Sequence, residues 1–471
     1  YINTSVFDTI EPSKPEVSNM KRIRVELSNE RLITPSGLTL VGAALGKSDL
    51  VKRSNRMTVD KKRSQPQIKN GDILLTYIGL LCQGKSSFDS VREFHEDPDY
   101  FKAALGIAYA IPSAETLRQR MDTIGSSLRE DILKANITMF KTIGVEPTAL
   151  ENRHVPLDMD VTPFDNSKTF KEGVSRTYKG FDGYAPMMAY IGTEGFLVNT
   201  ELREGKQHSQ KGTPAFLRQT LALARQLTAK PLLVRMDSGN DSGENLGILI
   251  EDGSWFVIKR NLRAAEKKEK WLEKVQDCCK DVRNPRDGKT VYVGSSWKDV
   301  LYKTSSGEEK TICMRIVYEV IERTIDKHGQ FLFPADVEVN TFWTNLGCSD
   351  DEVIDLYHAH GESEQYHSEI KTDMDVERLP SGKFDTNELV LELTVLAYNI
   401  LRIIGQSSLK SSRSPKTKRP VKRRRIRTVI SNLILIAGHV TEHARQVVLA
   451  LGCSNIWRHT FMDLYRQFML A

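Results

Sequence analysis

The segment Val155-Pro-Leu-Asp-Met-Asp-Val161 begins the part of the sequence that decides the fold. Its apolar residues predict a strand, and residues 184–191 and 195–202 predict two more. A helix over about residues 213–227 and a short, largely apolar strand over 231–236 follow. Three strands, a helix and a further strand predict an α/β fold with a sheet of mixed strand directions.

The sequence on both sides of this core predicts further regions. Helical periodicity before the core predicts a helical N-terminal domain, suited to DNA binding but also compatible with a plain helical bundle. The predicted organisation is an irregular N-terminal arm at 1–65, the helical domain at 66–150, the first part of the core at 151–260, a β-rich insertion at 261–340, the completion of the core at 341–405 with two long helices, and a basic linker with C-terminal helices at 406–471.

Composition places the chain among ordinary globular proteins and excludes several classes. Hydrophobic residues make up 39% and charged residues 27% of the 471 residues. No stretch reaches the roughly 20 uncharged apolar residues of a membrane span, and the N-terminus shows no secretory pattern. The six cysteines are scattered without metal-binding spacing. We therefore expect a cytoplasmic protein with reduced thiols and no membrane partner.

Positive charge is concentrated in one segment, at residues 410–427. It carries ten Lys or Arg residues and no acid, so that the remainder of the chain has a net charge of about −4 against +6 for the whole. Such clustering favours contact with a polyanion, and Lys422, Arg423, Arg424 and Arg425 are the predicted contacts with the DNA backbone. The alternative is a solvated tether, because its serines and prolines also predict a flexible linker.

Two carboxylates follow predicted core strands. Asp160 lies at the end of the first strand and Asp237 directly after residues 232–236. The carboxyl ends of strands are where α/β proteins place their sites, and a divalent cation compensates an ionised carboxylate there. A lone Asp at a strand end is more often a turn or cap residue. Asp158 is an alternative to Asp160, because it lies on the same face of the strand.

A third carboxylate belongs to a spaced polar set. Tyr357, His360, Glu364 and Lys371 lie at i, i+3, i+7 and i+14 of the first predicted long helix, which places them on one face. The alternative is a solvated helix face, because the surrounding residues are also polar.

This spacing resembles the Y-x2-R-x3-E-x6-K signature of bacterial insertion-sequence DDE transposases. The surrounding sequence looks like one branch of them, the thirteen-eighty insertion-sequence family. The resemblance runs with gaps from about residue 30 to the C-terminus. Its motifs are Leu157-Asp-Met-Asp-Val-Thr162, Leu202-Arg-Glu-Gly-Lys-Gln-His-Ser209, Leu233-Val-Arg-Met-Asp-Ser-Gly239, Thr344-Asn-Leu346 and Leu396-Ala-Tyr-Asn399.

The resemblance implies an RNase H-like core with a β-rich insertion before the last catalytic helix. It implies that Asp160, Asp237 and Glu364 are the catalytic and metal-binding triad, with Asp160 preferred over Asp158 because Thr162 follows it as in the family. Tyr357, His360 and Lys371 would contact the DNA end. His360 departs from the family's Arg, and an imidazole cannot make the bidentate, permanently charged phosphate contact of a guanidinium.

The chemistry expected of such a triad is two-metal phosphodiester cleavage. Two Mg²⁺ ions, for which Mn²⁺ would substitute, can serve both ends of an in-line displacement. The predicted function is a bacterial, nucleoid-associated cut-and-paste transposase. A homodimer would bind terminal inverted repeats, hydrolyse the DNA ends and join their 3′-hydroxyls to target DNA. The alternatives are a DNA-binding protein without strand transfer and a nuclease of the same fold.

Overall fold

A nine-stranded mixed sheet runs through the computed structural model, which describes residues 23–57, 66–304, 306–417, 419–443 and 446–471. Its order is β10-β11-β12-β13-β9-β8-β2-β6-β7. The five core strands are β2 (Val155–Val161), β6 (Met187–Ile191), β7 (Phe196–Glu201), β8 (Leu232–Met236) and β9 (Trp255–Arg260). Strand β2 is antiparallel to β6 and parallel to β8, so the prediction of a mixed α/β sheet is confirmed.

The predicted strand at 184–191 is interrupted. Pro186 has no backbone N–H to donate, and the chain leaves the main sheet before it. The residues ahead of the proline belong to a separate three-stranded sheet. That small sheet consists of β3 (Phe164–Asp165), β4 (Ser175–Arg176) and β5 (Asp182–Tyr184).

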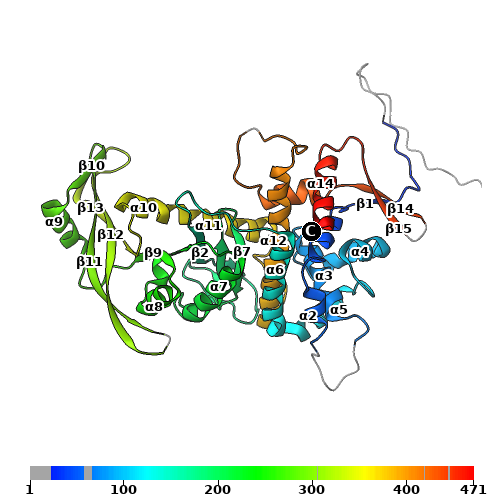
Figure 1. Ribbon diagram of the computed structural model, residues 1–471, viewed down its shortest axis with the longest axis horizontal. Helices are drawn as coiled ribbons and strands as arrows, with labels where there is room; N and C mark the ends of the chain where they lie inside the picture. Colours follow the sequence, from blue (N-terminus) through cyan, green and yellow to red (C-terminus); the bar gives the residue numbers. More distant parts are fainter. Residues whose placement is uncertain (1–22, 58–65, 305, 418, 444–445) are drawn as a thin grey trace, which may run out of the picture.

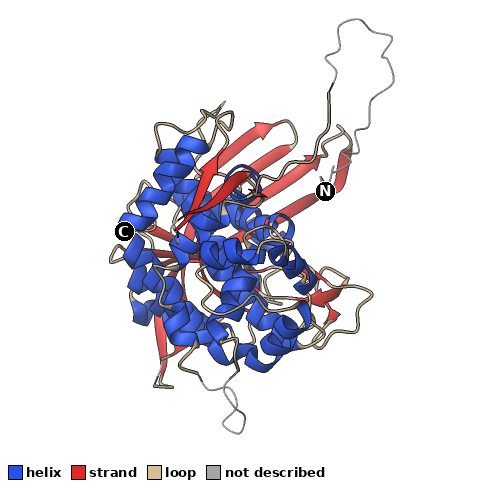
Figure 2. Ribbon diagram, turned by 90° about the vertical axis from the view of Figure 1, so that its right-hand side faces the viewer, coloured by secondary structure: helices blue, strands red, loops and turns tan. Residues whose placement is uncertain are grey.

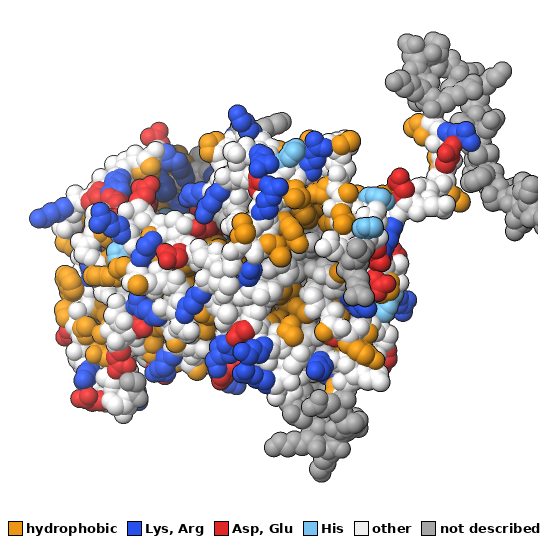
Figure 3. Space-filling model, turned by 45° about the vertical axis from the view of Figure 1, so that its right-hand side comes forward, with side chains coloured by type: hydrophobic (Ala, Val, Ile, Leu, Met, Phe, Trp, Pro, Cys, Tyr) orange, Lys and Arg blue, Asp and Glu red, His pale blue; other side chains and the backbone are white. Residues whose placement is uncertain are grey.

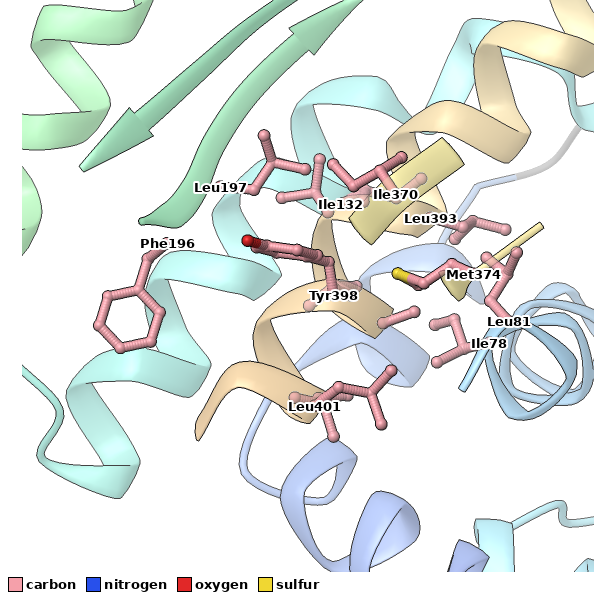
Figure 4. Close-up of a cluster of buried hydrophobic side chains, with 14 of the residues drawn as sticks. Ile78, Leu81, Ile132, Phe196, Leu197, Ile370, Met374, Leu393, Tyr398 and Leu401 are labelled. Atoms are coloured by element: carbon pink, nitrogen blue, oxygen red, sulfur yellow. The ribbon is translucent and has the colours of Figure 1, made fainter. Parts of the chain in front are cut away.

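Helices pack on the core and connect it to the rest of the molecule. Residues 213–227 form a helix as predicted, and the second long helix predicted within 341–405 extends beyond that region to Lys410. A buried apolar cluster joins α12 and the neighbouring helices α3 (Asn70–Leu81) and α6 (Arg129–Ile143) to strand β7, with Tyr398, Ile132 and Leu197 among its members (Figure 4). The core helices are α7 (Thr213–Leu227), α8 (Gly243–Asp252) and α12 (Phe384–Lys410).

The residues predicted as a β-rich insertion extend the core sheet instead of forming a sheet of their own. Strand β13 pairs with β9, from Thr341 opposite Arg260 to Thr344 opposite Val257. This pairing protects β9, which would otherwise expose unpaired backbone groups at a sheet edge. The strands are β10 (Asp281–Arg286), β11 (Lys289–Lys303), β12 (Glu309–Ile325) and β13 (Phe331–Thr344), with an unpredicted helix α9 (Lys268–Cys278) beside them. They form one end of the molecule (Figure 1).

The opposite end is helical and includes part of the predicted irregular arm. Residues 1–22 and 58–65 lie outside the described residues, but 38–54 form two helices, so that expectation is wrong there. Their apolar residues pack into the main core, which local pattern did not reveal. Viewed from this end, helices fill the centre of the molecule (Figure 2). They are α1 (Leu38–Leu45), α2 (Leu50–Ser54), α3 (Asn70–Leu81), η1 (Phe88–His95), α4 (Pro98–Leu105), α5 (Ala114–Ile124), η2 (Gly125–Leu128) and α6 (Arg129–Ile143).

The C-terminal region corrects a second expectation. Residues 427–470 were expected to form one or two helices, but a β-hairpin interrupts them. The hairpin strand β14 pairs with β1 (Leu32–Ile33), about 400 residues away in sequence, which no local pattern predicts. The elements are α13 (Ile426–Val429), the π-helical turn η6 (Ile430–Ile434), β14 (Gly438–His443), β15 (Gln446–Leu451) and α14 (Arg458–Leu470).

The surface is mixed in charge. On the face shown in Figure 3, Lys and Arg side chains are spread among acidic, apolar and uncharged ones. Among the described residues, none of the helices has the length and apolar character needed to cross a membrane.

Candidate active site

Two neighbouring parallel strands carry the first two predicted catalytic carboxylates. Strands β2 and β8 pair in parallel with Met159 opposite Met236, so Asp160 and Asp237 follow at the same level of the sheet. Both strands consist of buried, mostly apolar residues up to that level. The sheet therefore places both carboxylates at the carboxyl ends of adjacent strands, as predicted.

Asp160 is the most electrostatically perturbed member of the site. Its Oδ1 accepts a hydrogen bond of 2.7 Å from the Val161 backbone N–H. Burial, together with the negative charges of Asp237 and Glu364, raises the pKa of Asp160 to about 7. The three predicted carboxylates therefore lie close enough to repel one another.

Asp237 caps the short turn η3 (Ser238–Asn240) that follows β8. Its Oδ1 accepts hydrogen bonds from the Gly239 N–H at 3.1 Å and the Asn240 side-chain amide at 2.7 Å. Burial raises the pKa of Asp237 as well. One carboxylate oxygen is thus held by the turn, which fixes the side chain at the strand end.

Glu364 lies on a helical segment that changes its winding three times. The predicted single α-helix consists of α10 (Asp350–His358), a 3₁₀ turn η4 (Ala359–Glu362), α11 (Ser363–Ser368) and a π turn η5 (Glu369–Asp373). The four signature residues are therefore not spaced on one ideal α-helical face, because each change of winding rotates the residues beyond it. Glu364 itself is exposed.

The three predicted DNA contacts on this segment differ in accessibility. Tyr357 is half-buried against Phe342, with ring centroids 4.7 Å apart. The Lys371 Nζ donates to the Pro163 carbonyl at 2.6 Å and lies 5.5 Å from the centre of the Phe164 ring. His360 is only 6% exposed, so the predicted contact between His360 and DNA finds no free imidazole surface here.

His360 instead belongs to a buried ion-paired group with Asp158 and Arg235. The Arg235 guanidinium donates to both Asp158 oxygens, at 2.6 and 2.7 Å, and His360 Nδ1 lies 2.9 Å from Oδ1. Burial tends to raise the pKa of Asp158, but Arg235 and His360 outweigh it and lower that pKa. Burial tends to lower the pKa of His360, but Asp158 raises it. Asp158 is therefore fully engaged, whereas Asp160 is not.

The basic segment lies beside Glu364. A cavity of about 480 Å³ separates α11 from residues 421–425. It is lined by Glu364, Gln365, Ser368, Glu369, Val421, Lys422, Arg423 and Arg425. Lys422 is largely exposed, and Arg423 stacks on Tyr366 with its guanidinium carbon 4.5 Å from the ring centre. Cationic side chains thus line a hollow beside the helical segment that carries Glu364.

This part of the basic segment is not a free tether. Arg425 forms an ion pair with Asp373 at 2.8 Å, and the Arg424 carbonyl accepts a bond of 2.8 Å from Arg402. The Arg424 side chain is only 8% exposed and donates to Ser408 at 2.7 Å. The expectation of a flexible linker is therefore wrong for its last residues, and Arg424 points inward instead of toward DNA.

The donor set suits a hard divalent cation. Asp160, Asp237 and Glu364 supply only carboxylate oxygens, which Mg²⁺ prefers, and a cation would relieve their mutual repulsion. Within the described residues, no three His, Cys, Asp or Glu side chains are already gathered as a metal site. The strands thus bring the backbones together, and the carboxylate groups still have to converge on an ion.

Sequence reasoning missed Arg235 and Asn240. Arg235 lies within the largely apolar strand predicted over 231–236, and it precedes Asp237 by two residues just as Asp158 precedes Asp160. The matching offset was a usable signal only once β2 and β8 were known to be parallel neighbours. Asn240 had none, because its bond to Asp237 depends on the conformation of the turn.

Carboxylates at the ends of adjacent strands, beside a hollow lined with cations, suit an enzyme that acts on a polyanion with divalent metal ions. The family model described as "Transposase DDE domain group 1" matches residues 15–470. The chain therefore belongs to this family and is a transposase, an enzyme that acts on DNA; such enzymes generally use divalent metals.

Other comparisons add less. A cryo-EM structure of the piggyBac transposase synaptic complex with hairpin DNA is 12% identical, with a TM-score of 0.37, and the match covers 93% of this chain and 80% of that chain. This likeness is too weak to define the fold. No curated protein sequence matches significantly.

Proposed function

We propose that the protein is a cut-and-paste transposase that uses Asp160, Asp237 and Glu364 to hold a pair of Mg²⁺ ions. The observation that carries the proposal is the parallel pairing of β2 with β8, which places Asp160 and Asp237 at the same level of the sheet. The raised pKa of Asp160, about 7, supports it, because the negative charges of Asp237 and Glu364 add to the effect of burial. Structural carboxylates are normally paired with cations, as Asp158 is with Arg235. Because Asp158 is already paired with Arg235, Asp160 is the better candidate for the metal ligand.

The sheet order supports an RNase H-like core. Strands β7, β6 and β2 form an antiparallel set, and β8 and β9 add to β2 in parallel. The acidic residues follow the first strand and the fourth, which are adjacent in the sheet. The proposed domains are this core, the extension from β10 to β13 and the helical end, which combines the elements from β1 to α6 with those from α13 to α14.

The residues of this chain would divide the reaction between them. When bound, the metal pair would activate the attacking water or 3′-hydroxyl and stabilise the leaving oxygen. Lys422, Arg423 and Arg425 would bind the DNA backbone in the cavity beside Glu364. Tyr357 and Lys371 would contact the DNA end, whereas the buried His360 and Arg424 are not proposed as contacts.

Two DNA ends must be cut together, so we propose that two protomers act in one synaptic complex on the terminal inverted repeats of a bacterial element. The mass of the complex with end DNA, measured by light scattering, should correspond to two protomers. A stable complex of one protomer with one end, active in joining, would contradict the dimer.

A plasmid assay tests the chemistry. A supercoiled plasmid carrying the native flanks of the gene would be incubated with protein and Mg²⁺. Wild type should give paired cuts and strand-transfer products, while Asp160→Asn, Asp237→Asn and Glu364→Gln should each lose more than about 10³-fold in rate, on the order of 4 kcal/mol.

The matched control is Asp252→Asn, which removes a carboxylate paired with Arg225 on the helices that cover the core. It should cut normally. Binding without cutting in wild type would favour the DNA-binding alternative, cuts without joined products would favour a nuclease, and cutting that survives Glu364→Gln would overturn the triad.

A further inference from the structure

We propose that Asp158, Arg235 and His360 are positioning residues. They form a buried clamp that holds β2, β8 and the catalytic helical segment where Asp160, Asp237 and Glu364 can share metal ions. The inference rests on the proposed triad and assigns a role to three residues outside it.

The clamp connects three separate elements. Asp158 lies directly opposite Arg235 in the pairing of β2 with β8. Arg235 Nη1 also donates to the Leu356 carbonyl of α10 at 2.9 Å, and His360 joins Asp158 from the 3₁₀ turn. Every guanidinium nitrogen of Arg235 therefore donates a hydrogen bond, and these hydrogen bonds join β8 to β2 and to α10.

Each clamp residue lies within four residues of a triad residue in the sequence. Asp158 and Arg235 precede Asp160 and Asp237 by two residues, so each lies on the same face of its strand as its carboxylate. His360 precedes Glu364 by four residues, about one helical turn. A displacement of the clamp would therefore move the triad by a comparable amount.

A role in overall stability alone does not account for this arrangement. Buried ion pairs are often no more stabilising than well-packed apolar residues of similar size. What a bidentate guanidinium–carboxylate pair adds is fixed geometry. All three side chains are nearly inaccessible, at 3% exposure for Asp158 and Arg235 and 6% for His360, so the clamp cannot bind substrate directly.

The test measures direct binding of Mn²⁺ to the full-length protein without DNA. Binding is monitored by the loss of the electron paramagnetic resonance signal of free Mn²⁺. The clamp variants are Arg235→Met, Arg235→Lys, Asp158→Asn and His360→Gln. We expect Mn²⁺ affinity to fall about 10- to 100-fold, as is usual when groups that orient metal ligands are removed. Arg235→Lys keeps the positive charge but loses the planar guanidinium that donates to both Asp158 oxygens, so this variant should also bind Mn²⁺ weakly. It keeps the test valid even if Arg235→Met fails to fold.

Two reference variants separate the explanations. Asp160→Asn tests the triad itself and should also lose Mn²⁺ affinity. Arg225→Met removes another arginine–carboxylate pair of the same core, with Asp252 at 2.8 Å, and should destabilise the fold without changing Mn²⁺ affinity.

Three results would overturn the clamp. Unchanged Mn²⁺ affinity in folded Arg235→Lys and Asp158→Asn, with a loss in Asp160→Asn, would refute it and leave the proposed function standing. An equal loss in Arg225→Met would make the effect one of general stability. Loss of Mn²⁺ in Asp158→Asn but not in Asp160→Asn would make Asp158 the ligand, and both proposals would fail.

Discussion

Glu392 is a buried carboxylate of α12 with an incomplete set of partners. Its Oε1 lies 3.3 Å from Arg129, but its Oε2 accepts no hydrogen bond among the described residues. Burial raises the pKa of Glu392 to about 8, and the nearby Glu388 contributes to the rise. The folded protein therefore holds a proton here that the unfolded chain would release at neutral pH.

Replacing this carboxylate should change how stability depends on pH. The pKa of Glu392 is higher in the folded state than its ordinary value of 4.5. The contribution of Glu392 to the free energy of unfolding is therefore fully present below about pH 4.5 and is lost as pH rises toward 8. Urea unfolding should show Glu392→Gln more stable than wild type at pH 8, by on the order of 4 kcal/mol, and nearly equal at pH 4.5. Glu130→Gln, at an exposed position, is the control. A constant difference at both pH values would contradict the assignment.

At the scale of elements, Arg402 ties α12 to the catalytic helical segment and to the basic segment. Its fully buried guanidinium pairs with Glu369 in the π turn, donates to the Tyr398 hydroxyl at 2.6 Å and donates to the Arg424 carbonyl. The backbone N–H of Ile426 also donates to Glu369, at 3.3 Å. This buried ion pair thus helps to hold the basic segment beside Glu364.

Breaking that pair should loosen the basic segment. Arg402→Met leaves the Glu369 carboxylate buried without its cation, which typically costs about 3–5 kcal/mol of unfolding free energy. Limited trypsin digestion should then cut faster within residues 411–425. The double variant Arg402→Met with Glu369→Leu should recover most of the stability, since no unpaired charge remains. A double variant as unstable as the single one would contradict this reading.

The cavity-lining cations should control the salt dependence of DNA binding. If Lys422 and Arg423 each neutralise a phosphate, each alanine variant should lower the slope of log affinity against log salt by about 1. Lys230→Ala is the control, because Lys230 precedes β8 and so lies at the opposite end of that strand from Asp237. Equal effects at all three positions would point to general electrostatic attraction and not to a defined contact.

At the scale of the whole molecule, segments from the first and last parts of the described residues complete one core. Strand β1 pairs with β14, and the Ser36 N–H and hydroxyl both donate to the Ile436 carbonyl, at 2.9 and 2.8 Å. Helix α14 buries Phe461, Leu464 and Phe468 in the same core cluster. The helical end is therefore assembled from segments that lie on either side of the whole α/β core in the sequence.

Its stability should depend on the last turns of the chain. Phe468→Ala removes a fully buried ring and should cost about 3–5 kcal/mol in urea unfolding. Met469→Ala, at a side chain that is 56% exposed, should stay within about 0.5 kcal/mol of wild type. Similar losses in the two variants would show that α14 frays in solution and does not support the core.

The sequence alone determined the features that rest on local pattern and ordered motifs. Alternation and apolar runs predicted β2, β7, β8 and α7, and the motifs predicted the transposase family to which the chain belongs. Local pattern can do this because strand and helix periods are set by the backbone, and because the chemistry requires particular residues at particular spacings.

Only the tertiary structure decided which residues face one another. It paired Asp158 with Arg235, buried His360 and Arg424, joined β13 to β9 and placed β14 beside β1. Each of these contacts joins residues remote in sequence or depends on a change of helical winding. Their energy comes from desolvation and packing across the fold, which no window of neighbouring residues records.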